Sequence, residues 1–168
     1  MQTLLKLLQD GRFHSGEELG AVLGISRSAV WKRLQHLEAE HGLQFHKVRG
    51  RGYRLASPLS LLDPRKIDSL WPVEIMPTVD STNSEAMRRL AAGASTPFVI
   101  VAEQQTAGRG RRGRAWVSPY GENLYYSLAI TVRGGARELE GLSLVVGLAV
   151  LRALESLGVR DAGWKWPN

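Results

Sequence analysis

Residues 15–42, SGEELGAVLGISRSAVWKRLQHLEAEHG, decide the fold of the N-terminal third of the chain. Ser15 and Glu18 have the spacing of a helix capping box, and Ser26 has the chemistry of a second helix N-cap. A glycine follows each of the two apolar stripes, where helices commonly end in a left-handed residue. Two short helices joined by a tight turn that contains glycine are typical of a helix-turn-helix.

The flanking segments extend this prediction to a winged helix-turn-helix over residues 1–57. Upstream, Leu4, Leu7 and Leu8 share one face of a further helix. Downstream, the turn Arg-Gly-Arg-Gly at 49–52 separates two segments of strand length, as in a β-hairpin wing.

The second helix and the tip of the wing carry side chains that bond base edges or phosphates. The charge agrees, because nine Lys and Arg stand against five Asp and Glu up to Ser57, within a formal net charge of +6 for the chain. A solvated three-helix unit with a hairpin is the alternative, but caps, spacing and charge together favour DNA binding. The predicted DNA-binding residues are Arg27, Ser28, Trp31, Lys32, Gln35, Arg49 and Arg51.

A change of texture predicts a second domain over residues 65–168, after a Leu-rich connector at 58–64. The apolar run 98–102 has the length of a strand that is covered on both faces, and the apolar residues of 124–132 alternate as in another strand. Residues 138–157 form a helical pattern that is apolar nearly all round, which predicts an interior helix. The expected fold class is α+β, a winged helix-turn-helix followed by part of a mixed α/β domain.

Composition excludes several classes of protein. The 168 residues include no cysteine, so disulfides, thiolate nucleophiles and cysteine zinc sites are absent. The longest nearly apolar run, 142–151, is about half of what a membrane-spanning helix needs. The N-terminus lacks the apolar stretch of a signal peptide. From these two features we expect a cytoplasmic protein. All four histidines lie in the N-terminal third and are scattered, so we expect no protein metal site.

Two segments of the second domain have patterns typical of ligand binding. In Asp-Ser-Thr-Asn at 80–83, Thr82 is predicted to cap a helix together with Glu85. The positive N-terminus of that helix can hold a small polar group. In Gly-Arg-Gly-Arg-Arg-Gly-Arg at 108–114, the glycines permit close approach and the arginines offer forked donors to phosphate or carboxylate. A nucleic-acid-binding patch or a solvated loop fits the same composition, but Gln105 at a strand end favours a ligand lid.

A third segment, Trp164-Lys165-Trp166-Pro167-Asn168, sets Lys165 opposite two tryptophans. Such a lysine either extends to solvent or is a fixed cation in a pocket, and the other two segments favour the pocket.

With these motifs the whole chain resembles the bifunctional biotin protein ligases that also repress the biotin operon. That family continues past Lys-Trp-Pro-Asn with the rest of the catalytic sheet and a small C-terminal barrel. The chain therefore resembles the DNA-binding domain with a truncated ligase domain, and whether it is active by itself stays open.

The resemblance implies an ATP-dependent, AMP-forming ligation in two steps. The carboxylate of biotin attacks the α-phosphate of Mg-ATP to give biotinyl-5′-AMP, and a lysine of the biotin carboxyl carrier protein of acetyl-CoA carboxylase then attacks the anhydride. Arg109, Arg111 and Lys165 are the implied catalytic residues, and Trp116 is expected to anchor the loop by packing. The implied biotin- and adenylate-binding residues are Ser81, Thr82, Asn83, Gln105, Gly108, Arg109, Gly110, Arg111, Arg112 and Lys165.

Elementary electrostatics supports this set of residues independently. A carboxylate and a triphosphate repel each other by about 4 kcal/mol per pair of unit charges at ~4 Å and an effective dielectric near 20. Cations must offset this repulsion, whereas a carboxylate already ionised at pH 7 needs no general base.

The resemblance also implies transcriptional repression of biotin synthesis genes, with biotinyl-5′-AMP as co-repressor. Our hypothesis is that the adenylate orders the Arg-Gly loop, that the ordered surface dimerises, and that the dimer binds a palindromic operator. A non-catalytic, ligand-sensing winged-helix regulator is one alternative. A ligase for lipoate or octanoate is another, which the winged helix disfavours.

Overall fold

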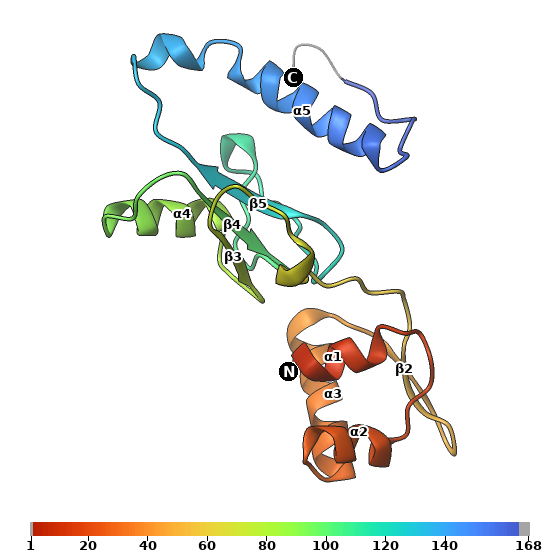
Figure 1. Ribbon diagram of the computed structural model, residues 1–168. Helices are drawn as coiled ribbons and strands as arrows, with labels where there is room; N and C mark the ends of the chain where they lie inside the picture. The colour runs from red at the N-terminus through yellow and green to blue at the C-terminus, as the bar shows by residue number, and fades with distance from the viewer. Residues whose placement is uncertain (1, 165–168) are drawn as a thin grey trace. The chain divides into compact units, whose positions relative to one another are not determined.

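The computed structural model describes residues 2–164, which form two compact units, up to Ala129 and from Ile130 onward (Figure 1). None of the helices in residues 2–164 combines the length and the apolar character that a membrane-spanning helix requires. The first unit holds all of the strands described below.

The predicted winged helix-turn-helix is confirmed at the N-terminus. The two strands of the wing pair antiparallel, with Phe45 opposite Leu55. The elements are α1 (Gln2–Leu8), α2 (Gly16–Leu23), α3 (Arg27–His41), β1 (Phe45–Val48) and β2 (Gly52–Leu55).

The predicted helix ends are confirmed as well. The hydroxyl of Ser15 accepts a hydrogen bond from the Glu18 N–H at 3.0 Å, and the Glu18 carboxylate accepts one from the Ser15 N–H at 2.8 Å. The Ser26 hydroxyl accepts from the N–H of Ala29 at 3.2 Å. A left-handed glycine follows α2 and another follows α3. These local bonds satisfy backbone groups that a helix leaves free at its ends, so they mark where both helices begin and end.

The core of the winged helix also takes in residues from outside 1–57. Leu59 of the connector and Tyr120 are buried in the same cluster as the leucines of α1 and α3. At the end of α3, His41 Nδ1 lies 2.8 Å from Gln104 Oε1, and its ring centroid lies 4.5 Å from that of Tyr120. The connector is thus packed rather than a free tether, while the predicted bounds 1–57, 58–64 and 65–168 stay predictions.

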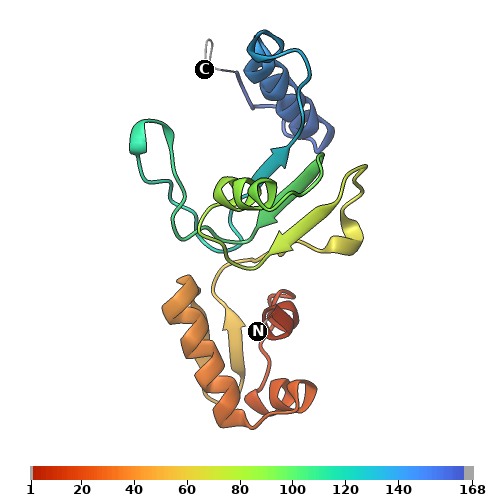
Figure 2. The same ribbon diagram turned by 90° about the vertical axis from the view of Figure 1, so that its left-hand side faces the viewer.

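A three-stranded sheet has the order β3-β4-β5, with β3 parallel and β5 antiparallel to the central strand. Figure 2 shows α4 along one face of this sheet, where Ala86 packs with Phe98, Ile100 and Ala129. Every residue of β4 is buried, as its apolar run predicts. The elements are a 3-10 turn (Pro64–Lys66), β3 (Val73–Met76), α4 (Thr82–Ala91), β4 (Phe98–Ala102) and β5 (Tyr125–Ala129).

The predicted strand over 124–132 is wrong in both length and facing. Only Tyr125–Ala129 is a strand, and the buried residues are Tyr125 and Ala129 rather than Leu124 and Tyr126, which are 67% and 49% exposed. Because α4 covers the face that carries Tyr125 and Ala129, these two residues are buried, although the alternating apolar residues are those of the other face, such as Leu124 and Tyr126.

The predicted interior helix over 138–157 is also wrong. The chain forms a 3-10 turn at Ala136–Leu139 and then α5 (Leu142–Ser156), in which no residue is buried. Val145, for example, is 64% exposed. An apolar helix becomes interior only where another element covers it, and the described part of the second unit contains no strand to do so.

A buried carboxylate follows β4 in the first unit. Glu103 is 3% exposed, its Oε1 accepts a hydrogen bond from the Leu62 N–H at 2.7 Å, and desolvation raises its pKa. The folded state therefore keeps this proton to a higher pH than the unfolded chain does. The contribution of Glu103 to stability is greatest at acidic pH and falls as the pH rises from about 4.5 through the raised pKa.

We expect Glu103→Gln to raise the melting temperature at pH 7 by a few degrees, because glutamine keeps the acceptor for Leu62 without a buried charge. Thermal unfolding of both proteins between pH 4 and pH 8 measures this. The difference should shrink toward pH 4, and a variant that is less stable at pH 7 would contradict the assignment.

Candidate functional site

A cavity of about 490 Å³ lies between the start of α4, the loop after β4 and the strand β5. It brings together residues that are far apart in the sequence and that the motifs single out. Its lining residues are Ser81, Thr82, Asn83, Gln105, Arg109, Gly110, Arg111, Trp116, Leu124, Tyr125, Tyr126 and Ser127.

The first wall is the N-terminus of α4. Ser81 is the N-cap, and its hydroxyl accepts from the N–H of Ser84, so the prediction of Thr82 as the cap is wrong. The predicted capping role of Glu85 is wrong too, because its carboxylate bonds Arg88 and Arg89. Arginine is a stronger partner for a carboxylate than a backbone N–H, and Asp80 already accepts the Ser81 N–H at 2.8 Å.

Gln105 joins this wall to Ser118. Its Oε1 accepts hydrogen bonds from the N–H and the hydroxyl of Thr82, at 2.8 and 3.2 Å. Its Nε2 donates to the Ser118 hydroxyl at 3.2 Å. The Thr82 and Ser127 hydroxyls lie 2.8 Å apart, which ties α4 to β5. The result is a connected set of polar groups at the base of the cavity, with donors and acceptors suited to a small polar ligand.

The second wall is the Arg-Gly loop, residues 108–116, which folds back on itself as a short hairpin. Arg109 and Ala115 form an antiparallel bridge, and the N–H of Gly110 donates to Arg114 O at 2.7 Å. Close packing requires glycine at 108, since a Cβ there would lie 2.9 Å from the Ser118 hydroxyl. The loop turns through a 3-10 segment at Arg111–Gly113.

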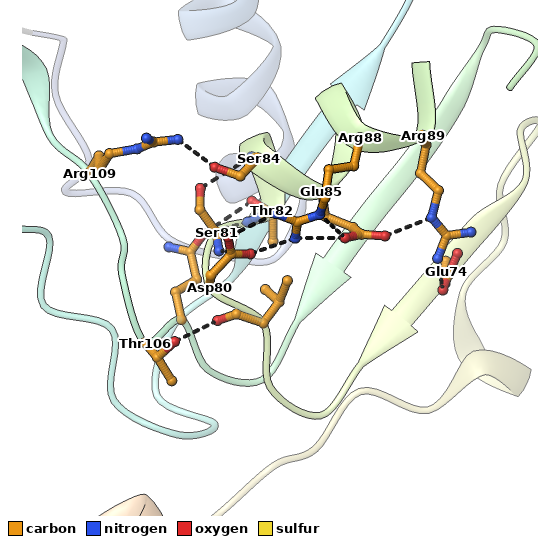
Figure 3. Close-up of polar contacts among 12 residues, drawn as sticks. Glu74, Asp80, Ser81, Thr82, Ser84, Glu85, Arg88, Arg89, Thr106 and Arg109 are labelled. Carbon is orange, nitrogen blue, oxygen red and sulfur yellow. Dashed lines mark hydrogen bonds and ion pairs between the residues drawn. The ribbon is translucent and has the colours of Figure 1, made fainter. Parts of the chain in front are cut away.

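Each predicted residue of the loop has a definite place. Arg109 donates from its guanidinium to the Ser84 hydroxyl on α4 (Figure 3), and both Arg109 and Arg111 line the cavity with exposed side chains. Gly108 and Arg112 are not among the lining residues. Trp116 is 60% exposed and lines the cavity, so the prediction that it anchors the loop by packing is wrong. The predicted Lys165 lies outside the described residues.

Outside the cavity, an ion-pair network links α4 to β3 and to the preceding loop (Figure 3). Arg88 bonds both Asp80 and Glu85, while Arg89 bonds Glu85 at 2.6 Å and Glu74 at 2.7 Å. The hydrogen bonds of Arg88 hold the pKa of Asp80 well below its usual range, and Arg89 and then Arg88 lower the pKa of Glu85. The helical spacing of Glu85 to both arginines is the sequence signal that could have revealed the two pairs with Glu85.

The predicted DNA-facing side chains are all exposed on α3 and at the wing. A second cavity, of about 410 Å³, lies beside the wing and includes Arg27, Lys47 and Arg49 in its lining. The guanidinium carbon of Arg51 lies 4.4 Å from the centroid of the Phe13 ring. Lys47, which was not among the predicted residues, also lines this cavity, and its Nζ donates to Glu38 Oε2 at 2.7 Å.

Comparison with known proteins adds independent findings. The family model of the biotin/lipoate A/B protein ligase family matches residues 75–168, and a helix-turn-helix domain model matches residues 1–54. The chain is 44% identical over 169 residues to the bifunctional ligase/repressor BirA of Salmonella typhimurium, which covers 99% of this chain and 52% of that protein. Identity to the Escherichia coli BirA is 42% over 168 residues, with 98% and 52% covered.

A biotin–[acetyl-CoA-carboxylase] ligase of Paracoccus denitrificans is 46% identical over 92 residues, which are 53% of this chain and 37% of that protein. The chain spans about half the length of the two bifunctional relatives. The match to a helix-turn-helix model and the match to the ligase family model occupy separate parts of the chain.

Proposed function

The chain belongs to the biotin/lipoate A/B protein ligase family, and from this premise we propose that the cavity beside α4 binds biotin and the adenylate formed from it. The observation that carries the proposal is the convergence of Ser81, Gln105 and Arg109 on one cavity. Gln105 and the N-terminus of α4 offer a donor and acceptor pattern for the ureido ring, and the Arg-Gly loop offers cations for the acid end.

In the proposed reaction, the biotin carboxylate attacks the α-phosphorus of Mg-ATP, and the bond to pyrophosphate breaks. Arg109 and Arg111 offset the repulsion between the two anions and then stabilise the charge that develops on the phosphoryl oxygens. Arg109 must exchange its bond to Ser84 for the ligand. We assign Lys165 the bridge between carboxylate and phosphate, by its place in the Lys-Trp-Pro-Asn motif.

In the second step we propose that a lysine amine of the biotin carboxyl carrier protein attacks the mixed anhydride and releases AMP. The name of the Paracoccus denitrificans relative supports biotin and acetyl-CoA carboxylase as the substrates, while the pairing of ATP with Mg²⁺ comes from the chemistry of the triphosphate. We place the reaction in the cytoplasm.

A calorimetric titration and an exchange assay test this assignment. Calorimetry should detect biotin binding and no comparable binding of lipoate, and tight binding of lipoate alone would favour the acyl-ligase alternative. In the complete protein, biotin-dependent exchange of pyrophosphate into ATP separates a ligase from a regulator that only senses the ligand. Absence of exchange together with firm biotin binding would favour the non-catalytic regulator.

For the N-terminal part we propose operator binding by α3 and the wing, with biotinyl-5′-AMP as co-repressor. The match to a helix-turn-helix model and the exposed basic side chains support it. We further propose that the adenylate orders the Arg-Gly loop and favours a homodimer that presents two winged helices. Sedimentation of the complete protein with and without biotin and ATP tests this step, and an unchanged monomer would contradict it.

We expect Arg49→Ala to weaken DNA binding similarly for specific and unrelated sequences, because Arg49 lies in the turn of the wing and is exposed. The slope of log K against log salt should fall in magnitude by about 0.9 if one phosphate contact is lost. Binding isotherms at several salt concentrations measure the slope. Loss of base discrimination with an unaltered slope would argue against a phosphate contact.

A further inference from the structure

Asp80 connects the two walls of the cavity although it does not line the cavity itself. Its Oδ1 accepts the N–H of Ser81, the N-cap of α4, at 2.8 Å. Its backbone carbonyl accepts the N–H of Ala107, at the root of the Arg-Gly loop, also at 2.8 Å. The position and orientation of this one residue therefore affect both the start of the helix and the start of the loop.

Arg88, which does not line the cavity, binds the carboxylate of Asp80 (Figure 3). Its NH1 donates to Asp80 Oδ2 at 2.9 Å and its NH2 donates to Asp80 Oδ1 at 2.7 Å, which is a two-bond fork. Its Nε donates to Glu85 Oε2 at 2.9 Å, so the guanidinium is itself fixed on the helix. A planar guanidinium with both ends bonded restricts the carboxylate in rotation as well as in distance.

We propose that Arg88 is a positioning residue for the ligand cavity. By holding Asp80, it sets the placement of the N-terminus of α4, at Ser81, relative to the start of the Arg-Gly loop, at Ala107. The inference rests on the proposed function only in naming biotin as the ligand whose affinity it tunes. Without the fork, the Asp80 carboxylate is free to rotate away from the Ser81 N–H. The backbone of Asp80, whose carbonyl accepts the Ala107 N–H, is then held less firmly.

A merely structural role for Arg88 is the alternative, because Arg88 and Glu85 also form an ordinary pair within one helix turn. Arg89 provides the matched control for that role. It is the next residue of α4, its side chain is 42% exposed against 53% for Arg88, and it bonds Glu85 and Glu74. Its hydrogen bonds and ion pairs do not include Asp80.

The first experiment compares amide hydrogen exchange in the 168-residue chain with that in its Arg88→Ala and Arg89→Ala variants. By residue-resolved NMR, Arg88→Ala should speed the exchange of the Ser81 and Ala107 amides, and Arg89→Ala should leave both close to the parent. Arg88→Lys, which keeps the charge without the fork, should give an intermediate result. Equal exchange of these two amides in the parent and in both alanine variants would overturn the proposal.

The second experiment measures biotin affinity by calorimetry on the same proteins. Arg88→Ala should bind biotin about fivefold more weakly, and Arg89→Ala should bind it as the parent does. Equal weakening in both variants overturns the positioning role. If the parent shows no affinity for biotin but its amides respond as expected, the proposed function fails while the positioning role stands.

Discussion

Replacing Arg109 and Arg111 together with glutamine should lower the affinity for biotinyl-5′-AMP by about 100-fold or more, because each charged hydrogen bond contributes about 1.5–3 kcal/mol. Both side chains line the cavity, and glutamine keeps hydrogen-bonding capacity while removing the charge. Calorimetric titration with the adenylate measures the loss. The acid end and the phosphoryl group of the ligand are the anions that this pair is proposed to hold.

Arg114→Gln is the matched control for that double substitution. Arg114 belongs to the same loop and is exposed, but it is not among the lining residues of the cavity. Its backbone carbonyl, which holds Gly110, is unchanged by the substitution. If the double variant bound the adenylate as well as Arg114→Gln does, the Arg-Gly loop would not be the anion clamp.

Gly52→Ala should destabilise the winged helix by about 3 kcal/mol, the sum of a left-handed backbone penalty and an overpacking penalty. Gly52 has φ +97°, and a Cβ there would lie 2.0 Å from the carbonyl oxygen of His14. The same strand is tied to that segment by hydrogen bonds of 2.8 and 2.9 Å between Tyr53 and His14. The methyl group therefore pushes the wing away from the segment that precedes α2, and DNA affinity should fall with it.

Gly50→Ala separates the two causes. Gly50 has φ +79° in the same wing, but a Cβ there would have no heavy atom within 4 Å. This variant should lose only the backbone term, about 1 kcal/mol. Thermal unfolding of both variants, followed by DNA titration, measures the difference, and equal losses would show that the contact with His14 is not decisive.

The winged helix was predictable because its signals are local. Ser15 and Glu18 are three residues apart, and their reciprocal bonds need no distant partner. The grouping of the cavity residues was expected from their motifs, but the bond from Gln105 to Thr82 spans 23 positions and no local pattern contains it. Whether these residues bind biotin stays a prediction.

The failures have a common physical origin, which is that burial depends on what covers a surface. Leu124 and Tyr126 alternate as a buried strand does, yet α4 covers the other face, where Tyr125 and Ala129 lie. In α5 no residue is buried, because the described part of its unit contains no element that covers its apolar side chains. Arg88 escaped notice for a different reason, because its partner Asp80 lies before the helix rather than on it.

Gln104 and Gln105 are neighbours in the chain, but their side chains serve different parts of the first unit. Gln104 Oε1 lies beside His41 at the end of α3, whereas Gln105 lines the ligand cavity. Since one peptide unit joins them, a displacement of Gln105 on binding of the proposed ligand would be transmitted to the contact between Gln104 and His41 at the end of α3, the helix proposed to bind DNA. Any resulting thermodynamic linkage runs both ways, so operator DNA would change ligand affinity by the same factor by which the ligand changes operator affinity.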